Sequence, residues 1–482
     1  MTIISAELRA ALSSDTGPET PHAPRYVAIA DAIEKAVQEG RLAPGEKLPP
    51  QRALAYDLGV TVGTVSRAYD LAARRGLVEG TVGRGTHVLA PQQPGSYGRG
   101  VGSASFLRIA PETPIPLKAN LPAPIGQHAA VAQAAEDVLR QNALRMSLAD
   151  YYSADQTGED RALAADWLAA PGFTADPQHL VLCSGAQQAL MTALMIATEP
   201  GDLVLGEALT YHVIHTQCRL AGRRLKPLPL DEEGIVPEAL EEACRTQRPR
   251  ALFLVPTLQN PTGAVMSQKR RAEIAAIAEA HALYLIEDGV YTRLTEPQRP
   301  LAAFTPERAL LVSSLSKTVA PGLRYGMVLC PPRLAERARA AQHALAQGLP
   351  AITIAMGTHL LRSGEAARLA GLQQKECRAR NALARETLGA YLTRPHPDSP
   401  HLWIELPEPW QREGHAYAFV EAARERGVAL AADADFAIAA PPPRAHIRLA
   451  LGAPESRALL EEGLARIKTL LEDGPLARRD LT

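Results

Sequence analysis

The sequence predicts an α/β protein in which a small N-terminal unit of short helices and a two-stranded ribbon precedes a large α/β domain. Two patterns support this prediction. In residues 25–75, apolar side chains recur at three- and four-residue spacing, as they do on the buried face of a helix. From residue 117 onward, short apolar runs alternate with Ala-rich amphipathic stretches, which is the pattern of strands and helices in an α/β sheet. The length of 482 residues allows two or three domains.

The composition describes a globular chain with ample core, because 46% of the residues are hydrophobic and 21% are charged. A formal net charge of −1 gives no general attraction to nucleic acid or membranes, so either partner requires a local patch. The N-terminus lacks the pattern of a signal peptide, and no apolar run approaches the ~18 residues of a membrane span. The five cysteines form no CxxC pair and favour a reducing compartment. We therefore expect a cytoplasmic protein.

The N-terminal elements follow one another closely. We expect residues 1–23 to form a flexible leader and residues 24–90 to form the first domain. Its predicted helices begin at Arg25 and stop at Glu39, cover Gln51–Leu58, and cover Thr61–Arg75. Two short strands around a glycine-rich tip at residues 80–86 then make a ribbon.

Within this domain, a short helix, a turn at Gly59 and a second helix are the layout of a helix-turn-helix. The segments Leu48–Ala55, Thr64–Tyr69 and Gly83–Thr86 resemble the winged helix-turn-helix of GntR-type bacterial regulators over about 65 residues. The family usually has a serine where this chain has Pro50, which removes a side-chain cap from the helix.

The resemblance implies a double-stranded DNA operator as a partner, and it assigns roles to particular side chains. Arg52 and Arg67 would contact bases or phosphates, and Arg84 at the tip of the wing would enter a minor groove. The DNA backbone would be held by Thr61, Thr64 and Ser66. The alternative is a helical oligomerisation module with a solvated basic face.

Residues 91–116 are rich in proline and glycine and show neither a helical nor a strand period. We interpret them as an interdomain linker, whose flexible chain would have a reach of roughly 30 Å. The large domain then covers residues 117–482, with a smaller α/β module from about residue 375. Its predicted strands are His179–Cys183, Leu203–Leu205, Ala251–Val255, Leu283–Ile286, Leu310–Val312, His401–Leu406 and His446–Leu451.

Polar residues follow four of these strands, at the edge where the functional groups of an α/β sheet gather. Lys317 lies in a loop of hydroxyl residues and can act as an amine nucleophile that forms a Schiff base. Ser314, Ser316 and Arg324 offer donors that suit a phosphate group. A lysine beside a phosphate cradle suggests pyridoxal phosphate, and the alternative is an ordinary solvated lysine in a polar loop.

The ordered set of these residues resembles the aminotransferase-like, pyridoxal-phosphate-dependent fold over about 360 residues. The resemblance implies that Lys317 carries the cofactor as a Schiff base and that Arg448 binds the carboxylate of an amino-acid ligand. It implies no metal site. The remaining roles are a pyridinium partner (Asp288), partners of the ring hydroxyl (Asn260, Tyr291), a stacking ring (Tyr211), and phosphate donors (backbone N–H groups of Gly185, Ala186 and Gln187, with Ser314, Ser316 and Arg324).

The chain departs from that family at a few positions. Gly289 stands where the family commonly has a second acidic residue, and Leu209 stands where it commonly has a proline. The loop at residues 150–158 matches a substrate and phosphate loop with one residue too many, so either Tyr151 or Tyr152 would reach a neighbouring subunit's cofactor.

A GntR-like winged helix in front of an aminotransferase-like domain is the organisation of MocR-type transcription regulators, which the chain resembles over residues 25–470. The resemblance implies a DNA-binding regulator that senses a small amino compound through pyridoxal phosphate, and a head-to-tail homodimer. Two alternatives stay open: an active aminotransferase with an accessory DNA-binding domain, and a regulator that senses pyridoxal phosphate itself.

Overall fold

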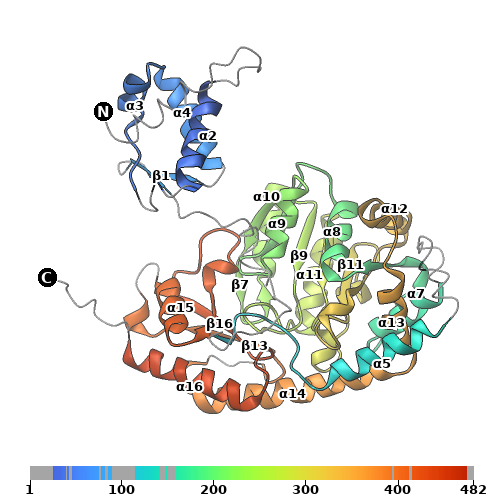
Figure 1. Ribbon diagram of the computed structural model, residues 1–482. Helices are drawn as coiled ribbons and strands as arrows, with labels where there is room; N and C mark the ends of the chain where they lie inside the picture. Colours follow the sequence, from blue (N-terminus) through green and yellow to red (C-terminus); the bar gives the residue numbers. More distant parts are fainter. Residues whose placement is uncertain are drawn as a thin grey trace. The chain divides into compact units, whose positions relative to one another are not determined.

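The computed structural model describes residues 25–38, 41–42, 46–74, 77–81, 85–88, 114–141, 148, 158–392, 396–411 and 415–474. The predicted leader and residues 91–113 of the predicted linker lie outside this part of the chain. Backbone contacts divide the chain into two units, residues 1–103 and 104–482, and each unit is described by itself (Figure 1).

The described part of the N-terminal unit has three helices and a hairpin at the predicted places: α2 (Arg25–Gln38), α3 (Gln51–Leu58), α4 (Val62–Arg74), β1 (Val78–Thr81) and β2 (Gly85–Val88). Helix α3 begins after Pro50 without a side-chain cap and ends at Gly59, whose φ of 65° a glycine adopts without strain. Ile29, Ile33 and Val65 are fully buried between the helices. The first domain is therefore a helix-turn-helix followed by an antiparallel ribbon.

The larger unit is built on a mixed sheet whose described strands run in the order β4–β12–β11–β10–β9–β5–β6. The strand bounds are β4 (Leu180–Ser184), β5 (Leu203–Glu207), β6 (Arg224–Leu228), β9 (Ala251–Leu254), β10 (Tyr284–Asp288), β11 (Ala309–Ser314) and β12 (Tyr325–Leu329). Strand β12 is antiparallel to both of its neighbours, and the other paired strands are parallel. The carboxyl ends of the parallel strands therefore share one edge of the sheet.

Helices cover both faces of this sheet. One apolar cluster packs the sheet against α8 (Ala186–Ala197), α9 (Val213–Leu220) and α12 (Ala335–Ala346). On the other face, an apolar cluster joins the sheet to α7 (Gly158–Leu168), α10 (Pro237–Gln247), α11 (Gln268–Ala280), α13 (Ala351–Arg362) and the first turns of α14 (Glu365–Leu388), beside α5 (Gln127–Leu139). This three-layer arrangement confirms the predicted α/β class.

The C-terminal module has its own core around a small antiparallel sheet in the order β13–β16–β15. Its elements are β13 (His401–Glu405), α15 (His415–Glu425), β14 (Val428–Ala429), β15 (Ala431–Ala432), β16 (His446–Ala450) and α16 (Arg457–Asp473). Strand β14 pairs in parallel with β3 (Ile115–Pro116), two residues that the sequence places in the linker. In Figure 1 this module lies at the orange and red end of the colour scale, with α14 leading into it.

The remaining regular elements are short. They are the hairpin strands β7 (Leu230–Asp231) and β8 (Gly234–Ile235) and the 3-10 turns η2 (Pro177–His179), η3 (Thr292–Leu294), η4 (Leu301–Ala303), η5 (Pro321–Leu323), η6 (Pro332–Leu334), η7 (Gly389–Tyr391), η8 (Glu408–Trp410) and η9 (Asp433–Asp435). In the part of the chain that the structure describes, no helix combines the length and apolarity of a membrane span.

Candidate cofactor site

The carboxyl edge of the main sheet brings most of the predicted cofactor residues together. Ser184, Asp288 and Ser314 are the last residues of β4, β10 and β11. Asn260 and Lys317 lie in the loops that follow β9 and β11. These residues are spread over more than a hundred positions of the sequence, and the parallel strands place them side by side.

Lys317 lies at the centre of this edge. Its Nζ donates a hydrogen bond to the backbone oxygen of Asn120 at 2.6 Å, and it lies 5.9 Å from the centroid of the Tyr291 ring. Burial, followed by the nearby positive charge of Arg448, lowers the pKa of Lys317 to about 8, although Asp288 acts in the opposite direction. At pH 7 about one-tenth of such an amine is neutral and able to attack a carbonyl carbon.

Asp288 is a buried carboxyl at the end of β10, with 6% of its surface exposed. The N–H of Val290 donates to its Oδ1 at 3.2 Å. Burial raises the pKa of Asp288 to about 6, while the bond from Val290 and the charge of Lys317 lower it. Among the described residues, no ion pair to Asp288 is present, so the carboxylate is available to a protonated ring nitrogen.

Several residues predicted to hold a phosphate lie where β4 turns into α8. Gly185 has φ 82°, and a Cβ at this position would lie 2.5 Å from Nη2 of Arg324. Nη2 of Arg324 donates to the backbone oxygen of Ser184 at 3.2 Å, which holds the guanidinium over the start of α8. Ala186 and Gln187 are the first residues of that helix, so their N–H groups have no acceptor within it.

The hydroxyl groups complete the cradle. Ser314 is buried at the end of β11, and its Oγ accepts a hydrogen bond from the N–H of Ser316 at 3.3 Å. With free helix N–H groups, two serine residues and an arginine, this donor set has the chemistry that a phosphate group requires. The Arg324 guanidinium can lie this close to the start of α8 only because Gly185 lacks a side chain.

Tyr211 follows β5 and lies beside the cradle. Its hydroxyl oxygen accepts a hydrogen bond from Nε2 of Gln187 at 3.1 Å. The backbone around it is tied to the C-terminal module, because the N–H of Thr210 donates to the oxygen of Phe436 at 2.9 Å and the N–H of Ile438 donates to the oxygen of Ala208 at 3.0 Å. The position of the Tyr211 ring therefore depends on both modules of the larger unit.

Arg448 on β16 is a buried cation, with 6% of its surface exposed. Its Nη1 donates to Oδ1 of Asn260 at 2.9 Å, its Nη2 donates to the backbone oxygen of Lys118, and its guanidinium carbon lies 4.7 Å from the Phe436 ring centroid. Burial lowers the pKa of Arg448 to about 10, so the group stays charged at pH 7. Its Nε is buried and has no partner among the described residues.

Sequence reasoning missed two residues of this site, Asn120 and His401. Nδ2 of Asn120 donates to the hydroxyl of Tyr291 at 3.0 Å and lies 3.0 Å from Nδ1 of His401. Nε2 of His401 lies 2.8 Å from the backbone oxygen of Gln259, which can only accept, so Nε2 carries the proton and Nδ1 accepts from Asn120. Burial lowers the pKa of His401 to about 3, and the ring stays neutral.

The predicted DNA-contacting residues lie on α3, α4 and the turn before α4. Arg52, Thr61 and Arg67 are exposed, and Thr64 and Ser66 are half-buried. Oγ1 of Thr61 accepts from the N–H of Thr64 at 3.2 Å, which caps α4. Arg84, Tyr151 and Tyr152 lie outside the described residues, so their predicted roles stay predictions.

Comparison with known proteins agrees with both units. Residues 25–88 match the family of bacterial regulatory proteins named gntR, and residues 113–467 match aminotransferase class I and II. The HTH-type transcriptional regulator YdeF of Bacillus subtilis is 29% identical over 93% of this chain and 95% of its own length. The probable rhizopine catabolism regulatory protein MocR of Rhizobium meliloti is 28% identical, over 65% of this chain and 66% of its own.

The chain belongs to the MocR-type family. Its members join a GntR domain to an aminotransferase class I and II domain, which is the order found here. Among solved structures, the larger unit of this MocR-type protein is similar to LysN, the alpha-aminoadipate aminotransferase of Thermus thermophilus, with a TM-score of 0.66 and 25% identity over 75% of this chain and 92% of LysN. LysN was crystallised with N-(5'-phosphopyridoxyl)-L-leucine.

Pyridoxal phosphate is the cofactor of this fold, and the residues of the MocR-type chain fit it. The fit rests on the amine of Lys317 with its lowered pKa, the buried carboxyl of Asp288, and the guanidinium of Arg324, whose approach to Gly185 a Cβ would block. These three groups would meet the carbonyl, the ring nitrogen and the phosphate of the cofactor, respectively.

Proposed function

We propose that this MocR-type protein is a cytoplasmic, DNA-binding transcription regulator whose larger unit binds pyridoxal phosphate at Lys317 and senses an amino compound or the cofactor itself. The observation that carries the proposal is the presence of two sites in one chain. The helix-turn-helix exposes Arg52 and Arg67, and the sheet edge of the larger unit holds the Lys317 amine against Asn120. The relatives named as HTH-type transcriptional regulators support the regulatory interpretation.

In this proposal the protein side chains bind and orient the cofactor. When bound, pyridoxal phosphate supplies a carbonyl that condenses with amines and a ring that withdraws electrons. Asp288 keeps the ring nitrogen protonated, and Asn260 and Tyr291 hold the ring hydroxyl. Tyr211 covers one face of the ring. The N–H groups at the start of α8 hold the phosphate together with Ser314, Ser316 and Arg324.

The effector would be gripped by Arg448. This guanidinium is already buried, and it is held in place by Asn260, Lys118 and the Phe436 ring. A carboxylate arriving at Arg448 would supply the negative charge that the buried cation lacks, and a planar guanidinium can bind it in bidentate fashion. An amino acid or a related amino compound offers this carboxylate together with an amine that competes with Lys317.

The response to the effector would be a change in DNA occupancy. A ligand shifts a conformational equilibrium only as far as it prefers one state over the other. Because Arg448 lies in the C-terminal module and Lys317 in the loop after β11 of the main sheet, a ligand that contacts both favours the state in which they lie close together. We propose that this change alters the spacing of the two winged helices of a head-to-tail homodimer on repeated or palindromic half-sites.

A second candidate function is transamination. The lowered pKa of Lys317, about 8, is an observation that favours it, because a lysine near neutrality can also move protons as a general base. Steady turnover of an amino donor and an oxo-acid acceptor would support an enzyme with an accessory DNA-binding domain. A single half-turnover without recycling would leave the regulatory function as the better description.

The decisive experiment measures binding of the full-length protein to DNA from the region upstream of its own gene, with and without pyridoxal phosphate and candidate amines. We expect Lys317→Ala to lose the lysine-dependent visible absorption of the cofactor and the response to amines, while basal DNA binding is kept. Lys375→Ala removes an exposed lysine of α14 and serves as the control. An absorption band unchanged in Lys317→Ala would contradict the assignment of this lysine.

A further inference from the structure

Three arginine side chains surround the ring of Tyr284 at the amino end of β10. The guanidinium carbons of Arg250, Arg308 and Arg333 lie 5.4, 5.7 and 5.3 Å from the ring centroid. The three cations are thus gathered around one aromatic ring, which is itself almost buried. This cluster lies at the opposite edge of the main sheet from Lys317, about 15 Å away along strands of four to six residues.

The fold holds the three arginines at the ends of neighbouring elements. The backbone oxygen of Arg250 accepts from the N–H of Tyr284 at 3.1 Å, and that of Arg308 accepts from the N–H of Leu285 at 2.9 Å. Arg333 follows β12, and its Nη2 donates to the backbone oxygen of Glu307 at 2.9 Å. The register of the sheet therefore fixes the backbone positions of Arg250 and Arg308.

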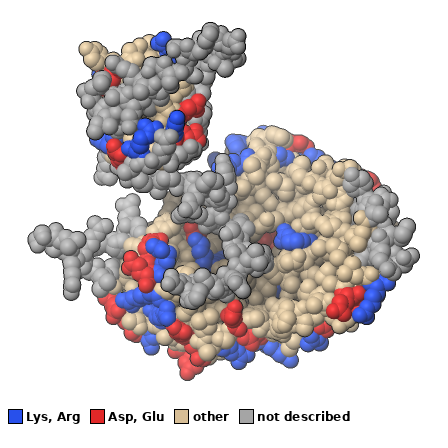
Figure 2. Space-filling view, viewed as in Figure 1, with Lys and Arg blue, Asp and Glu red and all other residues tan. Residues whose placement is uncertain are grey.

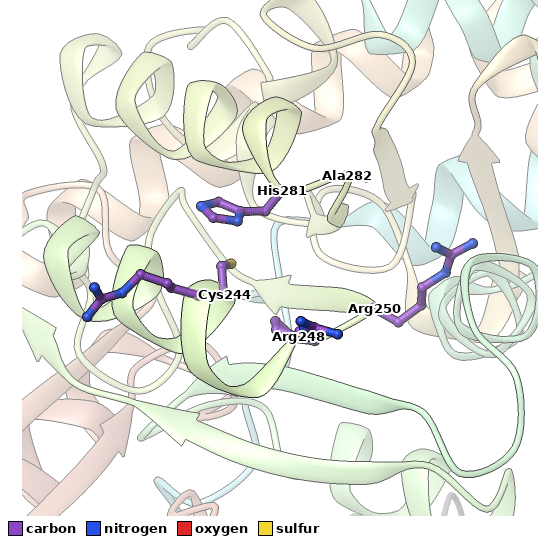
Figure 3. Close-up of a pocket in the computed structure, with 7 residues that line it drawn as sticks. Cys244, Arg248, Arg250, His281 and Ala282 are labelled. Carbon is purple, nitrogen blue, oxygen red and sulfur yellow. The ribbon is translucent and has the colours of Figure 1, made fainter.

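A cavity of about 460 Å³ adjoins the cluster and shares Arg250 with it. Its other basic residues are Arg245, Arg248 and His281. Figure 3 shows Arg248 and Arg250 at the start of β9, below the turn that carries His281 and Ala282. The basic surface thus continues from Tyr284 toward the end of α10.

Several cations of this surface have no carboxylate partner in the described part of the larger unit. Among the described residues, no carboxylate forms an ion pair with Arg248, Arg250, Arg308 or Arg333. Two other basic residues of the cavity do have carboxylate partners, because Glu241 lies 2.7 Å from His281 and Glu242 pairs with Arg245. Cations held this close repel one another, and a bound polyanion would relieve the repulsion.

The basic residues extend along the edge of the sheet. Arg224 is the first residue of β6, at the same edge as Arg250, Arg308 and Arg333. From β12 to β6 there are five strand-to-strand steps, which amount to roughly 24 Å at the usual strand spacing. A row of this length matches roughly seven base pairs of B-DNA along the helix axis, whereas a small anion needs one cluster.

We propose that this edge of the larger unit, defined by Arg224, Arg250, Arg308 and Arg333, is a second DNA-contact surface that binds the phosphate backbone. It reads no bases, because arginines on a sheet edge meet phosphates without entering a groove. The proposal rests on the proposed function only in that the protein binds DNA. The new element is that the aminotransferase-like unit itself contacts DNA and contributes to the affinity.

The test is the salt dependence of DNA binding by the full-length protein, on a duplex of about 60 base pairs from its own upstream region. Arg250→Gln with Arg333→Gln should reduce the slope of log K against log salt by about 2, since each lost phosphate contact removes about 0.9. Lys375→Gln with Lys468→Gln removes the same charge from exposed positions of α14 and α16 and should leave the slope unchanged. Arg250→Lys with Arg333→Lys should also keep it.

The outcomes separate this inference from the proposed function. The Arg52→Ala, Arg67→Ala variant tests the winged helix on the same duplex. If this variant loses DNA affinity while the Arg250→Gln, Arg333→Gln variant keeps the salt slope of the unmodified protein, only the second surface is overturned. A different result is that tripolyphosphate raises the melting temperature only when Arg250 and Arg333 are present, while their replacement leaves the salt slope of DNA binding unchanged. This result assigns the cluster to a small anion and also overturns the second DNA-contact surface. Unchanged visible absorption of the cofactor shows that each variant is folded.

Discussion

At the scale of single residues, the main feature of the site is Lys317, whose surroundings disfavour the charged form of its amine. Lys317 is half-buried and lies near the buried cation Arg448, and both conditions favour the neutral amine. In the proposed function, this amine would attack the carbonyl of the cofactor at neutral pH without a separate base to deprotonate it.

This charge balance predicts the pH dependence of cofactor uptake. The rate at which cofactor-free protein takes up pyridoxal phosphate should rise with pH around a midpoint near 8, against 10.5 for an ordinary lysine. At pH 7 the neutral fraction is roughly 300-fold larger than at the ordinary pKa. Rapid-mixing absorbance measurements test this. Arg448→Gln should move the midpoint upward, and a midpoint that stays in place would refute the role of this charge.

The lowered pKa of Lys317 also makes the free energy of unfolding depend on pH in a defined direction. Below pH 8 the amine is charged in both the folded and the unfolded chain, and the cost of burying that charge is fully present. Between about pH 8 and 10.5 the folded chain releases its proton first, so the unfolded chain binds more protons and the free energy of unfolding rises with pH. The contribution of Lys317 therefore favours the cofactor-free fold more in mild alkali than at pH 7.

Some of these residues could be predicted from the sequence, and others could not. Lys317, Asp288 and Asn260 follow apolar runs, and strand ends are where an α/β sheet gathers its chemistry. Asn120 belongs to no motif and lies 171 residues from Tyr291 in the sequence. His401 looks like an ordinary residue of a C-terminal strand. Only the packing of that strand against the loop after β9 turns it into a partner of Asn120.

At the scale of elements, a buried ion pair fastens α11 to the sheet. Nη1 of Arg271 donates to Oε1 of Glu287 at 3.2 Å, and both side chains are fully buried. Nη2 of Arg271 also donates to Oγ1 of Thr257 at 2.8 Å and to the oxygen of Pro256 at 2.9 Å. This arginine therefore holds the start of the loop that presents Asn260.

Removing one partner of this pair should be costly. Arg271→Leu leaves the Glu287 carboxylate buried without its cation, and we expect a loss of about 3–5 kcal/mol in the free energy of unfolding. Urea denaturation measures it. Arg457→Leu breaks the exposed ion pair with Glu376 and should cost less than about 1 kcal/mol. Equal losses in the two variants would contradict the importance of burial.

Elements with a strong pattern could be predicted, and weakly patterned ones could not. The apolar runs that make up β9 and most of β4 and β11 are typical of central strands buried on both faces. Strand β6 was not predicted, because this edge strand exposes Arg224 and Lys226 and shows no apolar run. Strand β3 has two residues, too few for any periodicity, and its partner β14 is more than 300 positions away.

At the scale of the whole molecule, acidic and basic side chains are nearly equal in number. Figure 2 shows acidic and basic side chains mixed along the lower rim of the larger unit, near α14 and α16, in keeping with a formal net charge of −1. Affinity for DNA must therefore come from particular groups of arginines and cannot come from overall charge.

The separation of the two units predicts separable defects. Arg52→Ala with Arg67→Ala should weaken DNA binding at least tenfold, since each lost phosphate or base contact costs about 1 kcal/mol or more. The visible spectrum of bound pyridoxal phosphate should stay unchanged. Fluorescence anisotropy and absorbance on the same preparations measure both properties. Arg41→Ala, an exposed change outside α3 and α4, is the control. A shifted cofactor spectrum in the double variant would contradict the separation.

Within the larger unit, backbone hydrogen bonds connect the C-terminal module to the segment that carries Tyr211. The backbone bonds from Thr210 to Phe436 and from Ile438 to Ala208 join the segment of Tyr211 to the segment beneath Arg448. The Tyr211 ring, which we expect to cover the cofactor, and the Phe436 ring, which packs against Arg448, therefore belong to two segments that are hydrogen-bonded to each other. We therefore expect a rotation of the C-terminal module to move Tyr211 with it, so that closure on a ligand at Arg448 would also shift the ring proposed to cover the cofactor.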